Sequence, residues 1–492
     1  MYMNKLSMLT LAIAAATTQL AHAAEVVDDD SKAVGTELLA QGLQDSSQAQ
    51  SRGFVEDAKL TLLSRNMVFY KNLRNNDAAA QNYRSDWSQA EMLTYTSGYT
   101  QGTVGVGLDA FANGAVRLNG GGGTGGSSNL PVDGSHCDEN AFGETISCQG
   151  QDSYGMVGGA VKLRISETEL KVGDLNPQSP VFGTWDGYLM PAHTNGVMFS
   201  SNEIKDLALQ GGHFTSGNAE NSSNRDGNLG TIYGYTRVDR ADYIGGDYTF
   251  SETLSGGLHA ANFEDVWHQY YADLYHFLAL GEGTSLLTSF NYYKTDDAGD
   301  ARAGEINNDS FSVSLALTTG AHTFTFAHQR INGDTPFDYL GISGFDGADN
   351  GVNGANPLGA YNGGGSIWLA NSSQWCDFNA PGEKSYKLQY DLDASSLGVP
   401  GLSFMARYVT GKDSDGSGAD PTGAYAWEAG VVDGEEWERD IQVAYVVQDG
   451  SAKGLSFKLR QATYRGNSAA NLNAGDDNEE VRFITEYPLD IL

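Results

Sequence analysis

The stretch YGMVGGAVKLRISETELKVGDL, residues 154–175, alternates between apolar and polar side chains. Its first half has glycine or an aliphatic residue at every second position: Gly155, Val157, Gly159, Val161, Leu163 and Ile165. The other side carries the cations Lys162 and Arg164 and, after a turn at 166–168, Lys171. Because successive side chains of a strand point to opposite faces, this pattern predicts a hairpin with one apolar and one cationic face.

Two kinds of protein would use such a hairpin differently. A soluble sandwich would bury the apolar face in a core. A membrane barrel would turn the apolar face to lipid and leave the cations facing water. The rest of the sequence has to decide between them.

The N-terminus predicts export from the cytoplasm. Lys5 forms a short positive segment, residues 6–16 are apolar, and Ala21-His22-Ala23 has the small-residue spacing of a cleavage site. The chain accordingly divides into a signal peptide at 1–23, a polar N-terminal extension at 24–52 and one large domain at 53–492. No later segment approaches the roughly 18 apolar residues of a membrane-spanning helix. The destination is therefore the periplasm, the medium, or the outer membrane in the form of a barrel.

The composition favours the barrel. The chain holds 62 glycines, 25 tyrosines and 20 phenylalanines but only 10 prolines, and hydrophobic residues total 40%. This mixture suits many long strands with a polar inner face and aromatic girdles at the membrane borders. The net charge of −33 argues against a nucleic-acid partner, because its phosphates would be repelled.

Connections between the strand-like segments alternate between short and long. Short turns are expected near residues 98, 167, 320, 399 and 451, and long loops at 119–153, 216–240, 331–380 and 411–436. We expect residues 119–153 to lack strands and residues 201–214 to form one strand. Sorted loop lengths are the signature of a barrel in the outer membrane of a Gram-negative bacterium, with short turns in the periplasm and long loops outside the cell. The predicted fold class is all-β, a transmembrane antiparallel β-barrel.

The sequence contains no pattern that predicts catalysis or metal binding. No GxSxG, HExxH or phosphate-loop motif is present, and no Cys/His spacing suggests a metal site. We therefore expect neither an enzyme nor a cofactor. Cys137 and Cys148 lie in one loop of an exported chain, where the environment is oxidising, so a disulfide between them is predicted, with Cys376 left over.

Cations fall consistently on the polar side of the expected strands, although acidic residues outnumber basic ones by 62 to 29. The set comprises Arg65, Lys162, Arg164, Lys171, Lys387, Arg407, Lys458, Arg460 and Arg482. A charge facing lipid would cost roughly 2–4 kcal/mol, which explains their orientation but not their common sign. Cations along a water-filled pore attract anions, and guanidinium groups bind carboxylates through paired hydrogen bonds. We expect these residues to form a basic ladder that guides carboxylate-bearing solutes.

Several longer segments are familiar and follow one another in a consistent order from residue 52 onward. They include GFVEDAKLTLLSRN (53–66), YTSGYTQGTVGVGLDA (95–110), KLRISETELKVGDLNPQSPV (162–181), NSSNRD (221–226), HQRINGDTPF (328–337), PGEKSYKLQYDLD (381–393), GVPGLSFMARYVTG (398–411) and EWERDIQVAYVVQDG (436–450). In these segments the chain resembles the OprD family of outer-membrane porins, the substrate-specific channels of Pseudomonas-type bacteria.

This resemblance implies a monomeric barrel of 18 strands whose extracellular loops fold into the pore. It implies selective passive uptake of small solutes such as amino acids or aromatic acids, with outer-membrane lipid as the other partner. Arg164, Arg407, Lys458, Arg460 and Arg482 match positions where the family has basic residues. Such a ladder faces an acidic patch in the family, and the resemblance makes Asp334 a candidate acid of the constriction.

Two other functions fit parts of the sequence. A sugar or chito-oligosaccharide porin would use Trp185, Trp368 and Trp375 as a stacking track near the mouth, although packing in girdles or loops is the commoner use of such residues. An adhesin or receptor barrel would be closed by its loops at 119–153 and 331–380 and would not conduct ions. Single-channel currents separate the three functions.

Overall fold

The structure is a computed structural model of residues 1–492, and it describes residues 48–74, 82–139, 145–342 and 365–492. The predicted signal peptide lies outside the described residues. So does the predicted N-terminal extension, except for residues 48–52, which include a 3₁₀ turn, η1 (Gln48–Gln50).

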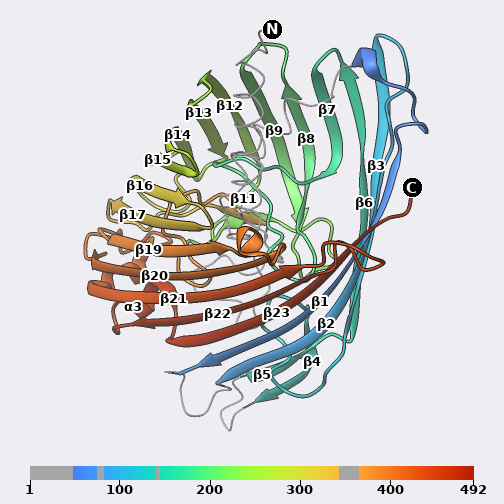
Figure 1. Ribbon diagram of the computed structural model, residues 1–492. Coiled ribbons are helices and arrows are strands. Elements are labelled where there is room, and N and C mark those ends of the chain that lie inside the picture. Colours follow the sequence, from blue (N-terminus) through green and yellow to red (C-terminus); the bar gives the residue numbers. More distant parts are fainter. Residues whose placement is uncertain (1–47, 75–81, 140–144, 343–364) are drawn as a thin grey trace.

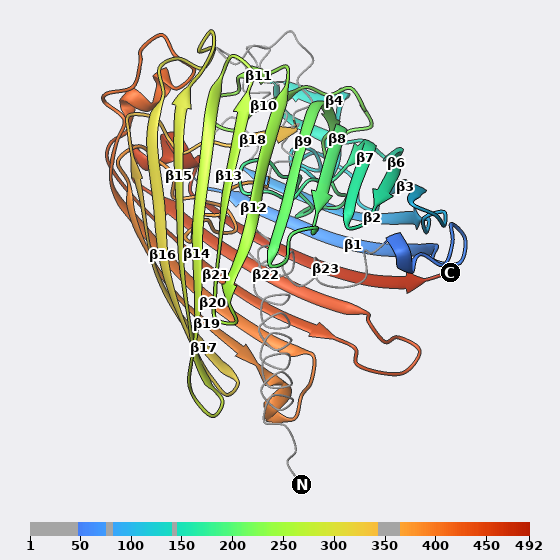
Figure 2. The same cartoon turned by 90° about the horizontal axis from the view of Figure 1, so that it is seen from above.

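Eighteen strands form one antiparallel sheet that closes on itself. They are β1 (Lys59–Leu73), β2 (Tyr83–Thr96), β3 (Val104–Arg117), β6 (Ser153–Ile165), β7 (Thr168–Leu175), β8 (His193–Ser201), β9 (Leu207–Asn218), β12 (Ala241–Ser251), β13 (Leu254–Phe263), β14 (Trp267–Gly281), β15 (Thr284–Asp297), β16 (Asn307–Thr319), β17 (His322–Asn332), β19 (Lys384–Asp393), β20 (Leu402–Asp415), β21 (Val432–Val446), β22 (Ser456–Gly466) and β23 (Asn478–Asp490). Each strand pairs with the next in this order, and β23 pairs with β1 to complete the barrel. Figure 1 shows the strands encircling a lumen that loops enter, and Figure 2 shows that they are tilted.

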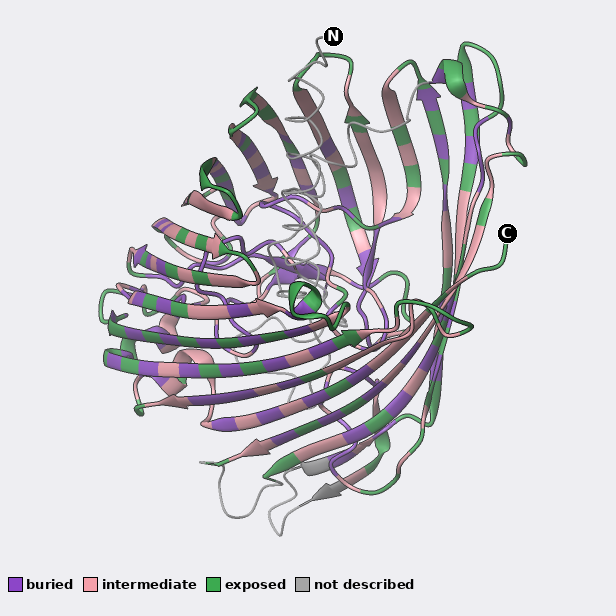
Figure 3. Ribbon diagram, viewed as in Figure 1, coloured by how far each residue is buried: buried purple, intermediate pink, exposed green. Residues whose placement is uncertain are grey.

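The alternating apolar and polar residues of the sequence correspond to side chains that face lipid and side chains that face the lumen. In the opening hairpin Val157 is 60% exposed on the outside, whereas Lys162 is 3% exposed and Arg164 is 9% exposed on the inside. Buried and exposed residues alternate along most strands in Figure 3. The predicted all-β barrel and its 18 strands are therefore confirmed.

Loop lengths sort to the two ends as predicted. At one end β6–β7, β12–β13, β14–β15 and β16–β17 are joined by two residues each: 166–167, 252–253, 282–283 and 320–321. At the other end lie long loops, including 118–152, 176–192, 219–240, 333–383 and 416–431. Short helical turns occur at η2 (Ala394–Leu397), η3 (Ala426–Gly430) and α3 (Ala470–Ala474). Within the described residues, no helix is long and apolar enough to cross a membrane.

Two expectations about local structure are wrong. Residues 119–153 contain a hairpin, β4 (Val132–Glu139) with β5 (Thr145–Gly150), in which Cys137 lies opposite Cys148 and is joined to it by a disulfide. The cross-link holds together strands that have no apolar alternation to reveal them. The expected strand at 201–214 is interrupted by a turn at 202–206, so that its start belongs to β8 and its remainder to β9.

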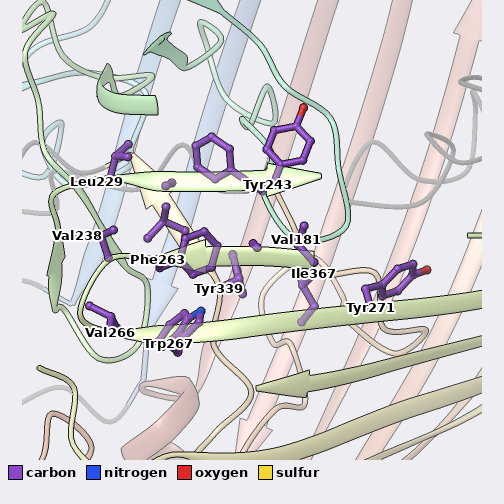
Figure 4. Packing of buried hydrophobic residues seen from close by; sticks show 14 of the residues in the cluster. Val181, Leu229, Val238, Tyr243, Phe263, Val266, Trp267, Tyr271, Tyr339 and Ile367 are labelled. Carbon is purple, nitrogen blue, oxygen red and sulfur yellow. The ribbon is translucent and has the colours of Figure 1, made fainter. Parts of the chain in front are cut away.

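The long loops also carry a small sheet of their own. β10 (Leu229–Thr231) pairs with β11 (Arg237–Val238) and with β18 (Leu340–Ile342), which joins the loop 219–240 to the loop 333–383. The sheet belongs to a buried apolar cluster inside the barrel, shown in Figure 4.

One side of the barrel supplies most of the wall of this cluster. We call the large inward side chains of β9 and β12–β15 the aromatic wall: Phe214, Tyr243, Phe263, Trp267, Tyr271 and Tyr293. They pack with loop residues such as Val181, Leu340 and Trp368, which are also buried. The long loops therefore dock inside the barrel against an apolar surface.

Candidate functional site: a charged wall and the loops that face it

The opposite side of the lumen is charged. We call a set of inward ionisable side chains of β19–β23 and β1 the charged wall: Arg65, Lys71, Lys387, Asp391, Arg407, Glu436, Glu438, Asp440, Lys458, Arg460, Glu480, Arg482 and Glu486. The six strands follow one another around the barrel, as Figure 1 shows. Strand alternation brings these residues to one surface, because their neighbours in sequence face lipid.

Neighbouring strands place opposite charges at matching positions. Arg407 of β20 lies opposite Asp440 of β21, and their side chains are joined by a 2.8 Å contact from Nε to Oδ2. Glu480 of β23 lies opposite Lys71 of β1, with 3.3 Å between Nζ and Oε2. The other oxygen of Glu480 accepts from Arg482 Nε at 2.5 Å. These buried charges of the wall are thus arranged as ion pairs, which offsets part of the cost of their burial.

Farther along β22 and β23, two arginines of the charged wall lie opposite each other on neighbouring strands. Arg460 of β22 lies opposite Arg482 of β23, and the two residues are 1% and 2% exposed. Lys458 lies two residues before Arg460 on the same face of β22. Like charges directly opposite each other destabilise a sheet. This level therefore concentrates positive charge in one part of the lumen at a cost to stability.

The loop 176–192 crosses to the charged wall. Arg65 contacts Asp186 of this loop (Nη1–Oδ1 2.7 Å) as well as Glu486 of β23 (Nε–Oε1 2.6 Å). The Arg482 guanidinium lies 4.8 Å from the ring centre of Tyr188 and donates to the Gly187 carbonyl at 3.3 Å. This loop was not identified from the sequence, where only the lack of alternation between two strands could have indicated it.

The loop 333–383 reaches the same wall through its last part. Glu438 accepts hydrogen bonds from the backbone N–H groups of Trp375 and Cys376, at 2.8 and 2.7 Å. The Trp375 ring centre lies 3.7 Å from Lys71 Nζ, a cation–π contact. Lys387 donates to the Ala370 carbonyl at 2.5 Å. Two loops thus narrow the lumen against the charged wall.

A separate group of cations lies at the short-turn end of β6 and β7. Asp109 is shared by Lys162, at 2.6 Å, and Lys171, at 3.1 Å. The Arg164 guanidinium lies 4.0 Å from the ring centre of Tyr99, and its Nε donates to Gln48 Oε1 at 3.1 Å. Of the nine predicted cations, these three are not on the charged wall, and the other six are.

Asp338 ties the loops to one another. Its buried carboxylate accepts hydrogen bonds from the backbone N–H groups of residues 232–234 and from the Tyr425 hydroxyl, at distances from 2.8 to 3.0 Å. Burial raises the pKa of Asp338 to about 6, while the hydrogen bonds it accepts act in the opposite direction. One carboxylate therefore connects the loops 219–240, 333–383 and 416–431.

Asp334 lies elsewhere. It is exposed beside Gly418 in the loop after β20. Carboxylates in contact with the predicted cations include Asp109, Asp186, Asp440, Glu169, Glu480 and Glu486. These carboxylates and Lys71 were not singled out from the sequence, since their partners come from distant strands and loops. Across the described residues, no group of three or more His, Cys, Asp or Glu side chains is arranged to hold a metal ion.

Comparison with known proteins agrees with this architecture. The family model described as "outer membrane porin, OprD family" matches residues 52–491. Porin D of Pseudomonas aeruginosa is 41% identical over 495 residues, covering 100% of both chains. A crystal structure of P. aeruginosa OprD has a TM-score of 0.74 and 40% identity, covering 91% of this chain and 99% of the other. The P. aeruginosa OpdK structure with vanillate has a TM-score of 0.72 and 31% identity, covering 89% and 100%. The chain belongs to the OprD family of outer-membrane porins.

Proposed function

We propose that this porin takes up small solutes that bear a carboxylate, such as amino acids or organic acids, by selective diffusion along the charged wall. The observation that carries the proposal is the opposed pair Arg460 and Arg482, placed at the level where a loop narrows the lumen. Two guanidinium groups facing each other concentrate positive charge in one part of the lumen, and guanidinium binds carboxylate through paired hydrogen bonds. A carboxylate passing between them would reduce their mutual repulsion.

The neighbouring acids explain how such a solute would also leave. Glu480 and Asp440 hold Arg482 and Arg407 in place and compete with a passing anion for their N–H groups. The solute then meets several weak sites in series, which permit entry without trapping. At the short-turn end Lys162 and Lys171 would form the last of these sites. We also propose that one chain acts as a monomer, since the lumen is enclosed by a single closed barrel.

Relatives and the positions of the tryptophans support this proposal over a sugar channel. OpdK was solved with vanillate, an aromatic carboxylate. Trp368 is buried in the apolar cluster and Trp375 lies against Lys71, so neither supports the idea of a track for stacking sugars. A closed adhesin receives no specific support from the site.

Single-channel recording in a planar bilayer tests the proposal, with small carboxylates and then oligosaccharides added to the purified porin. We expect discrete openings that a carboxylate blocks in part. In the double variant Arg460→Ala/Arg482→Ala, the affinity of the blocking carboxylate should fall by about tenfold or more. Each tenfold loss of affinity corresponds to roughly 1.4 kcal/mol of binding free energy. Arg439→Ala is the matched control, because Arg439 belongs to β21 but is exposed.

The competing functions give other results. If only oligosaccharides blocked the current, the porin would be a sugar channel and the proposal of a carboxylate solute would be wrong. Equal carboxylate block in the double variant and in Arg439→Ala would remove the role of the arginine pair. A folded barrel without openings would exclude transport.

A further inference from the structure

Residues 48–57 form a strap across the short-turn end of β6 and β3 before the chain enters β1. The backbone N–H of Gln48 donates to the Ser166 carbonyl in the β6–β7 turn at 3.0 Å. Ser51 Oγ donates to the Tyr99 carbonyl at 2.6 Å. Gln48 is 4% exposed. The strap therefore buries a polar side chain against the rim of the barrel.

A notch on the inner face of β3 receives this side chain. Gly105 faces the lumen and lies opposite Arg164 of β6 in the register. A Cβ atom on Gly105 would lie 2.2 Å from Gln48 Oε1, so glycine at this position makes the room that the amide occupies. Two residues farther on, a Cβ atom on Gly107 would lie 2.6 Å from Lys162 Cε. The two glycines thus leave space on β3 for side chains of other segments.

The amide of Gln48 has a fixed orientation. Its Nε2 donates to the carbonyls of Thr100 and Gly102, at 2.8 and 3.1 Å. Because an amide nitrogen only donates, these two contacts assign the oxygen to the other side, where it accepts from Arg164 Nε at 3.1 Å. Gln48 therefore positions a guanidinium with an acceptor that carries no charge.

Arg164 has no ion pair with a carboxylate among the described residues. Its guanidinium lies 4.0 Å from the ring centre of Tyr99, and its Nε is used by Gln48. Glu167 and Asp57 attract this guanidinium from a distance but form no ion pair with it. The contact through Nε leaves both Nη groups, which can bind a carboxylate as a pair of donors.

Neighbouring acids on the sheet are engaged by lysines. Lys162 and Lys171 share Asp109. Glu169 lies opposite Arg164 in the β6–β7 register, but it contacts Lys171 Nζ at 3.2 Å instead. Of the three described cations at this end of β6 and β7, Arg164 is therefore the one whose charge is not compensated by a direct ion pair.

We propose that Gln48 is a positioning residue of the transport path, which holds Arg164 aligned but uncompensated so that its guanidinium binds the solute carboxylate before release. This inference rests on the proposed function. A carboxylate at position 48 would fill the same space, but it would pair with Arg164 and compete with the solute. The neutral amide gives Arg164 the alignment that Asp440 and Glu480 give to arginines of the charged wall, without that competition.

Single-channel block by acetate tests this role, with acetate added to the short-turn side and then to the long-loop side of channels inserted in one orientation. We expect Gln48→Glu to weaken block from the short-turn side by about tenfold and block from the long-loop side by less than about twofold. Gln48→Met keeps the volume and the charge of Arg164 but removes the alignment, so it should weaken block from the short-turn side by only about threefold.

Gln101→Glu is the matched control for the added charge. Gln101 is exposed near the same rim and contacts only backbone carbonyls of the strap, those of Ser51 and Arg52. We expect this variant to be blocked like wild type from both sides. Equal block in Gln48→Glu and Gln101→Glu would overturn the inference, because an added charge at position 48 would then have no specific effect on Arg164.

A double-mutant cycle separates positioning from a purely structural role. In the background Arg164→Gln, the change Gln48→Glu should cause no further loss of block, because the group that pairs with the new carboxylate is absent. A further loss of about tenfold in that background would mean that Gln48 acts through the shape of the strap, and the inference would be wrong.

Failure of this inference and failure of the proposed function give different results. Absence of acetate block from either side of the wild-type channel would make both wrong. If Arg460→Ala/Arg482→Ala lost the block and Gln48→Glu kept it from both sides, the proposed function would stand and the role of Gln48 would be wrong. Heat-dependent mobility on a gel checks that each variant has folded.

Discussion

Both sides of the lumen are antiparallel β-sheet, but the inward side chains of one side are mainly apolar, whereas many of those on the other side are charged. The aromatic wall on β9 and β12–β15 presents large apolar rings that the long loops cover completely. The charged wall on β19–β23 and β1 presents paired acids and bases that the loops touch at a few points. In both cases the large hydrophobic residues that face outward, such as Ile244 and Ile441, are exposed to lipid. The inward residues alone decide whether a segment of wall becomes a core or the side of a channel.

The difference has an energetic basis. Apolar burial contributes roughly 25 cal/mol per Å² and needs no particular partner, so the aromatic wall can hold loops of varied sequence. Burial of charge is unfavourable unless each group is paired, so the loops meet the charged wall through ion pairs and hydrogen bonds as well as through two smaller apolar clusters, which include Met190 and Phe378. Loops docked on one wall therefore narrow the lumen without filling it.

Removing one partner of the buried Arg407–Asp440 pair should have the largest effect. Asp440→Ala removes the carboxylate that lies opposite the Arg407 guanidinium, in a site where the two side chains are 1% and 2% exposed. The expected loss in free energy of unfolding is about 3–5 kcal/mol. Asp413→Ala is the control: its contact with Lys384 at 2.9 Å is exposed, and such pairs contribute about 1 kcal/mol or less. Denaturant unfolding of both variants in detergent is the measurement, and equal losses would contradict the distinction.

A hydroxyl on the aromatic wall should have a smaller but specific effect. Tyr293 Oη lies 2.9 Å from the Pro180 carbonyl and 3.0 Å from the Trp368 backbone nitrogen, so it ties both narrowing loops to the wall. Tyr293→Phe should cost roughly 1–3 kcal/mol and increase conductance noise while retaining carboxylate block. Tyr292→Phe is the control, because the adjacent ring lies on the lipid side and contacts Asp309. Noise that stays at the wild-type level in Tyr293→Phe would show that the loops are held by packing alone.

A third effect depends on pH and concerns the loop 416–431. Burial, together with the nearby Glu436 carboxylate, raises the pKa of Glu428 to about 8. A carboxyl whose pKa is higher in the folded state than in the unfolded state stabilises the fold only while protonated. Its contribution is therefore lost as pH rises from about 4.5 to 8, at a rate of at most about 1.4 kcal/mol per pH unit.

Glu428→Gln should remove this dependence. The variant should equal wild type in thermal midpoint at pH 4.5 and exceed it at pH 8.5. Asp420→Asn serves as the control in the same loop, where hydrogen bonds from Thr422 lower the pKa of an exposed carboxyl. Parallel pH curves for wild type and Glu428→Gln would show that the buried carboxyl does not titrate in this range.

The sequence was most informative where apolar and polar side chains alternate regularly along a single strand. The hairpin 154–175, the inward cations and the apolar outward residues all follow from alternation, and the structure has them as predicted. The hairpin β4–β5 could not be predicted because a disulfide holds it rather than an apolar face. The inward loop 176–192 has no repeating pattern.

The partners of the cations show the same limit. Arg164 contacts Gln48, which is 116 residues away, and Arg65 contacts Glu486, which is 421 residues away. The sequence alone determined that Arg164 and Arg65 face the lumen, because the side on which a residue lies is set by counting along one strand. Only the tertiary structure decided which charges meet, which acid lies at the narrowed level and which wall the loops cover. Those outcomes depend on the register between strands and on contacts between distant loops, and neither quantity is carried by a local pattern.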